Sequence, residues 1–99
     1  MGLTQALAKE LGPKGIRVNA VCPVYVETDG LLSALADKNS PAGGKNVKAY
    51  LKKFMKEQSA LQRLPTAEEV ARVCLFLASD AASAVTGQSI NVDCGVLVQ

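Results

Sequence analysis

A run of alternating residues from position 16 to position 22 places the strongest constraint on the fold of this chain. Four small or apolar side chains share one face of the run: Ile16, Val18, Ala20 and Cys22. Val21 makes the opposite face partly apolar as well, which is typical of a strand in a buried parallel sheet. The run stops at Pro23, and a polar loop follows. Because open α/β sheets bind ligands beyond the carboxyl ends of their strands, residues 18–28 are predicted to form one wall of a small-molecule site.

Helical patterns flank this strand on both sides. Leucines at every fourth position between residues 3 and 11 predict an amphipathic helix that is ended by Gly12. A later helix is predicted to begin at Thr66, whose hydroxyl can cap the free N–H groups, and to end near Ala78. A second short strand is predicted over residues 89–93. Because helices separate the two strands in the sequence, the strands are predicted to be parallel.

Residues 29–65 differ in character and are predicted to form a helical cap. Helices are predicted over residues 30–37 and 45–58. The second of them has an apolar stripe made of Val47, Leu51, Phe54 and Met55. Another of its faces carries Lys48, Lys52 and Lys56. We interpret this basic face as a solvated one, and the alternative is recognition of a phosphorylated or carrier-bound acyl substrate.

The composition argues against several kinds of site. The chain has no histidine, which is the commonest general base and metal ligand. Its cysteines, Cys22, Cys74 and Cys94, include no CxxC pair, so no metal site is predicted and the thiols are expected to be buried in a reducing compartment. With two Tyr, two Phe and no Trp, no nucleic-acid binding is predicted. The longest apolar stretch is too short to span a bilayer and the start lacks a signal-peptide pattern, so a cytoplasmic, membrane-free protein is expected.

Several motifs in a fixed order carry a family resemblance. They are GLTQALAKEL at 2–11, GIRVNAVCP at 15–23, EEVA at 68–71, FLASD at 76–80 and VTGQ at 85–88. With these motifs the chain resembles, nearly end to end, the C-terminal part of short-chain dehydrogenases/reductases. The resemblance implies an α/β fold, namely the last two strands of a Rossmann-like doubly wound parallel sheet with their helices and the substrate-cap helices. Residues 1–99 would then be a partial NAD(P)-binding domain, with residues 29–65 as the substrate cap.

The resemblance also implies an NAD or NADP cofactor and hydride transfer between nicotinamide and a carbonyl/alcohol substrate. By position, the Val26 backbone N–H would hold the carboxamide, and the Thr28 hydroxyl would contact the carboxamide or the pyrophosphate. Pro23 would shape the turn beneath the ring, and Val24 belongs to the same contact loop. Thr28 has a second interpretation, as the cap of the helix that follows. Of the other polar residues near this loop, Asn19 is expected to satisfy backbone groups.

Tyr25 and two departures from the family pattern complete this loop and the C-terminal turn. Tyr25 is expected to be a pocket or surface residue rather than a catalytic phenol. Val24 and Cys94 lie where the family has glycine, which allows backbone conformations that a β-branched residue does not adopt.

The residues that perform the chemistry in this family have no counterpart in the sequence. These are the Gly-rich phosphate loop, the catalytic serine and the Tyr-xxx-Lys pair. No catalytic residue is therefore predicted, and the chain is expected to be inactive alone. The resemblance further implies a homo-oligomer that pairs through the segments from Thr66 to Ala78 and from Ser89 to Asp93. The alternatives are a non-catalytic interaction or oligomerisation fragment, or a truncated reading frame.

Overall fold

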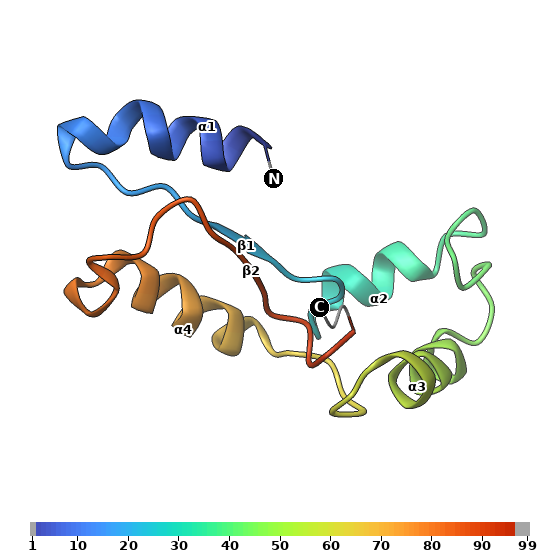
Figure 1. Cartoon of the computed structure of the whole chain (residues 1–99). Helices are drawn as coiled ribbons and strands as arrows, with labels where there is room; N and C mark the ends of the chain where they lie inside the picture. Colours follow the sequence, from blue (N-terminus) through green and yellow to red (C-terminus); the bar gives the residue numbers. More distant parts are fainter. Residues whose placement is uncertain (1, 97–99) are drawn as a thin grey trace. The chain divides into compact units, whose positions relative to one another are not determined.

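The computed structural model describes residues 2–96, which form two compact units. The first unit comprises residues 2–22 and 68–92, and the second comprises residues 23–67 and 93–96. Figure 1 labels the α-helices and the strands along the chain. In chain order the elements are α1 (Gly2–Leu11), the 3-10 turn η1 (Gly12–Lys14), β1 (Ala20–Cys22), α2 (Asp29–Leu35), α3 (Val47–Gln58), α4 (Ala67–Ala78), the 3-10 turn η2 (Asp80–Ala82) and β2 (Ser89–Asn91).

The first unit contains a pair of parallel strands, β1 and β2, which run side by side (Figure 1). Their register places Val21 opposite Ile90. The predicted parallel pairing is confirmed, but β1 is shorter than the strand expected from position 16. One reason lies just before β1, where the Val18 N–H donates to the Thr86 hydroxyl at 3.0 Å. Because a side chain takes the place of a strand carbonyl there, the regular ladder begins only at residue 20.

Two polar side chains that precede β1 tie it to distant backbone of the first unit. The Arg17 guanidinium donates to the carbonyls of Leu77 and Ser79 at the end of α4, at 2.7 and 3.2 Å. It also donates to the Val85 carbonyl at 3.2 Å. Asn19 donates to the same Val85 carbonyl at 2.9 Å and accepts from a backbone N–H through its Oδ1. The expectation that Asn19 satisfies backbone groups is confirmed, and Arg17 pairs with carbonyls that the helix end leaves free.

The three cysteines are less covered than the sequence led us to expect. Cys74 is exposed, and Cys22 and Cys94 are half-buried, so the prediction of buried thiols is wrong. On α4, Leu77 is buried, whereas Leu75 is 72% exposed. Within the described residues only one side of α4 is covered, and Cys74 lies outside it. The helical periodicity was correct, but it could not show how much of the helix would be covered.

The core of the second unit joins segments that are far apart in the sequence. Leu35 at the end of α2, Leu51 in α3 and Leu64 before α4 form one cluster, and none of them is more than 8% exposed. The rings of Tyr25 and Phe54 pack against this cluster. Both helices predicted between residues 29 and 65 are present, with their first and last residues shifted by two positions at most.

Each of these two helices begins with a side chain that accepts a hydrogen bond from the first turn. Thr28 caps α2, with its Oγ1 accepting from the Leu31 N–H at 3.2 Å. Asn46 caps α3, with its Oδ1 accepting from the Ala49 N–H at 3.4 Å. Such caps satisfy donors that a helix leaves unpaired at its start. The interpretation of Thr28 as a helix cap is therefore confirmed.

A buried aspartate organises the turn that follows β2. Asp93 is 4% exposed, and its Oδ1 accepts from the Gly95 N–H at 2.9 Å. The Leu61 N–H and the Ser59 hydroxyl both donate to the Cys94 carbonyl at 3.0 Å. These bonds hold Cys94 at a φ of 56°, in the left-handed region that favours glycine.

Replacing Cys94 with glycine is expected to raise the free energy of unfolding by about 0.5–1 kcal/mol. The left-handed conformation costs a non-glycine residue roughly 1–2 kcal/mol, and the extra freedom of glycine in the unfolded chain offsets part of that gain. Urea denaturation followed by circular dichroism measures the difference. The control is Cys94→Ala, which removes the thiol and keeps the strain. A glycine variant no more stable than the alanine variant would contradict the prediction.

Candidate functional site

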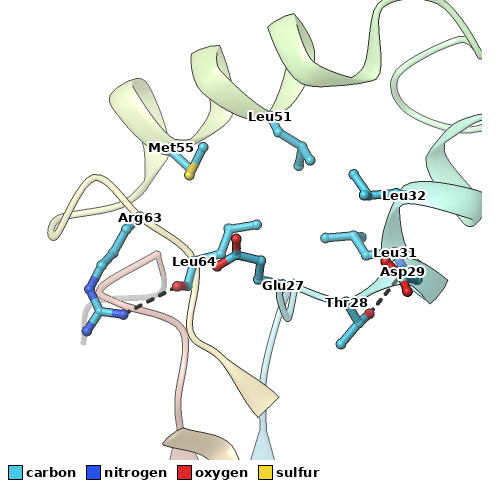
Figure 2. A pocket seen from close by; sticks show the side chains of 9 residues that line it. All are labelled: Glu27, Thr28, Asp29, Leu31, Leu32, Leu51, Met55, Arg63 and Leu64. Atoms are coloured by element: carbon cyan, nitrogen blue, oxygen red, sulfur yellow. Dashed lines mark hydrogen bonds between the residues drawn. The ribbon is translucent and has the colours of Figure 1, made fainter. Parts of the chain in front are cut away.

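The second unit contains a pocket of about 450 Å³ (Figure 2). This volume lies within the range typical of small-molecule sites. The start of α2, the inner face of α3 and the segment before α4 all contribute side chains to it. The lining residues are Glu27, Thr28, Asp29, Leu31, Leu32, Leu51, Met55, Arg63 and Leu64.

Aliphatic side chains form most of the pocket wall. Leu31 and Leu32 project from the first turns of α2, and Figure 2 shows Leu51 and Met55 of α3 facing them. Leu64 completes the wall next to the unit's core. Such a wall favours a ligand with an apolar part, because burying apolar surface is favourable by about 25 cal/mol per Å².

Polar groups gather where the chain enters α2. Glu27, Thr28 and Asp29 are consecutive and exposed. The Glu27 N–H donates to the Pro65 carbonyl at 3.0 Å, and Glu27 forms a parallel bridge with Thr66. The start of α2 is thereby attached to the segment that precedes α4. This attachment fixes the backbone position from which the Thr28 hydroxyl projects.

The Thr28 hydroxyl can form a hydrogen bond in addition to the one that caps α2. Its oxygen accepts from the Leu31 N–H as the helix cap. A hydroxyl also has a proton to donate, and within residues 2–96 this proton has no hydrogen-bond acceptor. The cap holds the side chain in place without using that proton. Capping and ligand binding by Thr28 are therefore compatible.

Arg63 supplies the positive charge of the pocket lining. Its guanidinium donates to the Leu64 carbonyl at 3.3 Å, and in Figure 2 it lies on the opposite side of the pocket from Thr28. The lining thus has carboxylates at the start of α2 and a guanidinium across from them.

Of the four residues predicted to bind a cofactor, only Thr28 lines the pocket. Pro23, Val24 and Val26 belong to the preceding loop and are not among the lining residues. Val24 is 39% exposed, and its φ lies outside the positive range. Its backbone therefore does not need the conformational freedom of the glycine that the family has there. The role of these four residues stays a prediction.

Sequence reasoning missed most of the lining. Glu27 and Asp29 flank Thr28 directly, and this cluster of polar residues at a predicted helix start was a usable signal. Arg63 lies 35 residues further along the chain, and nothing in its local pattern points to the start of α2. The apolar lining residues of α3 were predicted as its inward stripe, but the sequence did not show that the start of α2 would lie opposite them in the pocket.

An aromatic group lies beside the core of the second unit. The hydroxyls of Tyr25 and Tyr50 are 3.0 Å apart, and the Tyr25 and Phe54 ring centroids are 4.9 Å apart. The hydrogen bond with Tyr25, followed by burial and the charge of Tyr25, raises the pKa of Tyr50 to about 12. Tyr25 packs against the core and is not among the pocket-lining residues, so its arrangement is that of a packing residue.

Two further findings concern residues 2–96 as a whole. No group of three or more histidine, cysteine, aspartate or glutamate side chains in this range is arranged to hold a metal ion. In the same range, no helix combines the length and the apolar character needed to cross a membrane.

Comparison with known families and curated proteins gives consistent matches. The family described as Enoyl-(Acyl carrier protein) reductase matches residues 1–97. The 3-oxoacyl-[acyl-carrier-protein] reductase FabG of Aquifex aeolicus is 41% identical over 96 residues, which cover 97% of this chain and 34% of that protein. The Dehydrogenase/reductase SDR family member 6 of Rattus norvegicus is 38% identical over 95 residues, which cover 96% of this chain and 36% of that protein. The chain therefore spans about a third of the length of these curated relatives.

Two solved structures are similar to the chain along almost its whole length. One is YwfH, an NADPH dependent reductase involved in bacilysin biosynthesis, with a TM-score of 0.82 and 31% identity over 99% of this chain and 36% of that one. The other is a short chain dehydrogenase family protein from Francisella tularensis, with a TM-score of 0.82 and 35% identity over 99% of this chain and 40% of that one.

Proposed function

Because this chain belongs to the short-chain dehydrogenase/reductase family, we propose that it supplies the nicotinamide-side loop and the substrate cap of an NAD(P)-dependent oxidoreductase. The proposed reaction is hydride transfer between nicotinamide and a small carbonyl/alcohol substrate. In it the chain corresponds to the C-terminal part of the enzyme. The relatives support the oxidoreductase class, and YwfH is described as NADPH dependent.

The observation that carries this proposal is the Thr28 hydroxyl at the edge of the apolar pocket. Thr28 is exposed, is oriented by its bond to Leu31, and has a proton to donate. A carboxamide oxygen is a matching acceptor, and a nicotinamide fixed by such a bond presents a defined face for hydride transfer. In this proposal Pro23, Val24 and Val26 form the backbone beside that ring.

The aliphatic side of the pocket supports a role for residues 29–65 as a substrate cap. Leu31, Leu32, Leu51 and Met55 would surround the apolar part of the substrate. Exclusion of water by these side chains strengthens the electrostatic interactions of a reacting carbonyl. The proton that the carbonyl oxygen needs would come from outside the residues of this chain. We therefore expect no turnover from the 99-residue chain alone.

A second candidate function is an interaction surface on α4. Leu75 is 72% and Phe76 is 47% exposed, although both are large apolar residues. Exposed apolar groups of this kind favour association. They support the proposed pairing of subunits through the segments from Thr66 to Ala78 and from Ser89 to Asp93. Size-exclusion chromatography with light scattering tests this, and an entirely monomeric chain would contradict it.

The oxidoreductase proposal can be tested in a chimera. The aligned segment of the Aquifex aeolicus reductase would be replaced by this chain, and NAD(P)H-dependent carbonyl reduction would be measured. We expect the chimera to be active and the Thr28→Val variant to raise the KM for the cofactor about three- to tenfold, since a net hydrogen bond contributes about 0.5–1.5 kcal/mol. Thr28→Ser keeps the hydroxyl and should keep the KM.

A loss of stability alone must be distinguished from a loss of binding, because Thr28 also caps α2. The matched control is Asn46→Ala, which removes the cap of α3 in the same unit. Its expected effect is destabilisation by about 1 kcal/mol with an unchanged cofactor KM. Equal KM values for the Thr28→Val variant and the parent chimera would refute the role of Thr28. A folded chimera without any reduction would refute the proposed function.

A further inference from the structure

Three of the four aromatic residues of this chain lie together where the loop of residues 23–28 meets α3. Tyr25 belongs to that loop, and Tyr50 and Phe54 belong to α3. The ring centroid of Tyr25 is 4.9 Å from that of Phe54 and 6.5 Å from that of Tyr50. These separations are typical of aromatic pairs that attract one another. The three rings therefore pack the loop against α3 within the second unit.

One hydrogen bond adds a directional contact to this packing. The hydroxyl oxygens of Tyr25 and Tyr50 are 3.0 Å apart. Within residues 2–96, this is the one side-chain hydrogen bond that joins the loop to α3. The same bond is the main cause that raises the pKa of Tyr50 to about 12, so this hydroxyl keeps its proton at neutral pH. Because a hydrogen bond depends on both distance and angle, it fixes the separation of loop and helix more narrowly than ring packing does.

The residues beside this pair line the pocket. Leu51 directly follows Tyr50 in α3, and Met55 lies one turn further along the same side of the helix. Figure 2 shows both of these side chains facing the start of α2 across the pocket. Thr28, at that start, lies three residues after Tyr25. The contact between the two tyrosines therefore sets how far the aliphatic wall on α3 lies from Thr28.

We propose that Tyr25 and Tyr50 are positioning residues that determine the length of the aliphatic carbonyl substrate that the pocket accepts. Neither of them lines the pocket, so they act through the side chains that do. While their hydroxyls are bonded, the wall on α3 stays at one distance from Thr28. A substrate that is too short then leaves a void and one that is too long meets the wall, and both lower the affinity. This inference rests on the proposed oxidoreductase function.

The test uses the 99-residue chain and a series of straight-chain methyl ketones from butanone to decanone. Met55 is the only methionine after the first residue, so an isotope-labelled methyl group there gives one NMR signal from the pocket wall. Titration of this signal gives a dissociation constant for each ketone. We expect one ketone to bind most tightly, and we call its affinity relative to the next longer ketones the length preference.

Removing either hydroxyl is expected to weaken the length preference, because the wall on α3 is then free to shift. In Tyr25→Phe and in Tyr50→Phe the preference should fall about three- to tenfold, or about 0.7–1.4 kcal/mol, the size of one net hydrogen bond. Both variants keep the aromatic ring and its packing. The double variant should lose no more of the preference than either single variant, because all three lack the same bond.

A matched control separates this bond from a general loss of stability. Ser40→Ala removes another hydroxyl of the same unit, which donates to the Leu35 carbonyl at 2.8 Å. It should lower the urea midpoint about as much as the tyrosine variants do and leave the length preference unchanged.

The proposal fails if the parent chain binds all the ketones equally, or if both tyrosine variants keep its length preference. It also fails if Ser40→Ala loses as much of the preference, or if the losses from the two tyrosine variants add up in the double variant. In the chimera with the Aquifex aeolicus reductase, the ratio of kcat/KM values for the same ketones should change by the same factor, and an unchanged ratio would overturn the proposal. A folded chimera that reduces none of the ketones would refute the oxidoreductase function, whereas the ketone titration would still decide the positioning role.

Discussion

Replacing Gly95 with alanine is expected to lower the free energy of unfolding by about 3 kcal/mol, the largest loss that we predict for one substitution. Gly95 has a φ of 86°, which L-residues rarely adopt. An added Cβ would also overlap the Ala60 side chain. The Ala60 N–H donates to the Gly95 carbonyl at 3.4 Å, so separating the two residues would break a backbone bond. Urea denaturation followed by circular dichroism measures the loss.

A second glycine in the same unit separates backbone strain from the overlap. Gly43 has a φ of 70°, and a Cβ there would meet no atom within 4 Å. Gly43→Ala should therefore cost only the strain, roughly 1–2 kcal/mol. Adding Ala60→Gly to the Gly95→Ala variant should restore part of its stability, because it vacates the overlapping volume. If Gly43→Ala and Gly95→Ala proved equally destabilising, the overlap would have no energetic role.

Replacing Arg17 with alanine is expected to lower the free energy of unfolding by about 2–3 kcal/mol. One guanidinium serves the carbonyls of Leu77, Ser79 and Val85 at 2.7–3.2 Å. A hydrogen bond to a charged group contributes about 1.5–3 kcal/mol to stability. Because Arg17 is only half-buried, we expect its three bonds together to contribute no more than about that amount. The positive charge also lies favourably at the carboxyl end of α4. Thermal and urea denaturation of the variant check the value.

The matched control for Arg17 is another arginine, Arg72 on α4. Its side chain is 72% exposed, and within residues 2–96 it pairs only with Glu68, four residues earlier. Arg72→Ala is expected to stay within about 0.5 kcal/mol of the parent, as exposed helical ion pairs do. The free energy of unfolding of Arg17→Lys should lie between those of the parent and the alanine variant. An ammonium lacks the planar set of N–H donors with which the guanidinium reaches three carbonyls. If Arg17→Ala and Arg72→Ala lowered the free energy of unfolding by similar amounts, the hydrogen bonds of Arg17 to the three carbonyls would not have the stabilising role that we predict.

The helices were predictable because their signals are local. The leucine repeat before Gly12, the inward stripe of α3 and the acidic start of α4 each report on a few neighbouring residues. The parallel pairing of β1 and β2 also followed from the order of elements along the chain. The extent of β1 did not, because the Thr86 hydroxyl that interrupts its ladder lies 68 residues after Val18. The exposure of Cys74 was missed for the same reason, since periodicity says nothing of what covers a helix.

The family and the loop that ends at Thr28 were accessible from residue order alone, because motifs and turn residues act over short distances. The pocket was not. Thr28 lies in it with Met55 and Arg63 only because the intervening chain folds back and packs Leu35, Leu51 and Leu64 together. That packing depends on the shapes of side chains from separate segments, which no local pattern encodes. Tertiary structure therefore decided which polar groups share the pocket with Thr28.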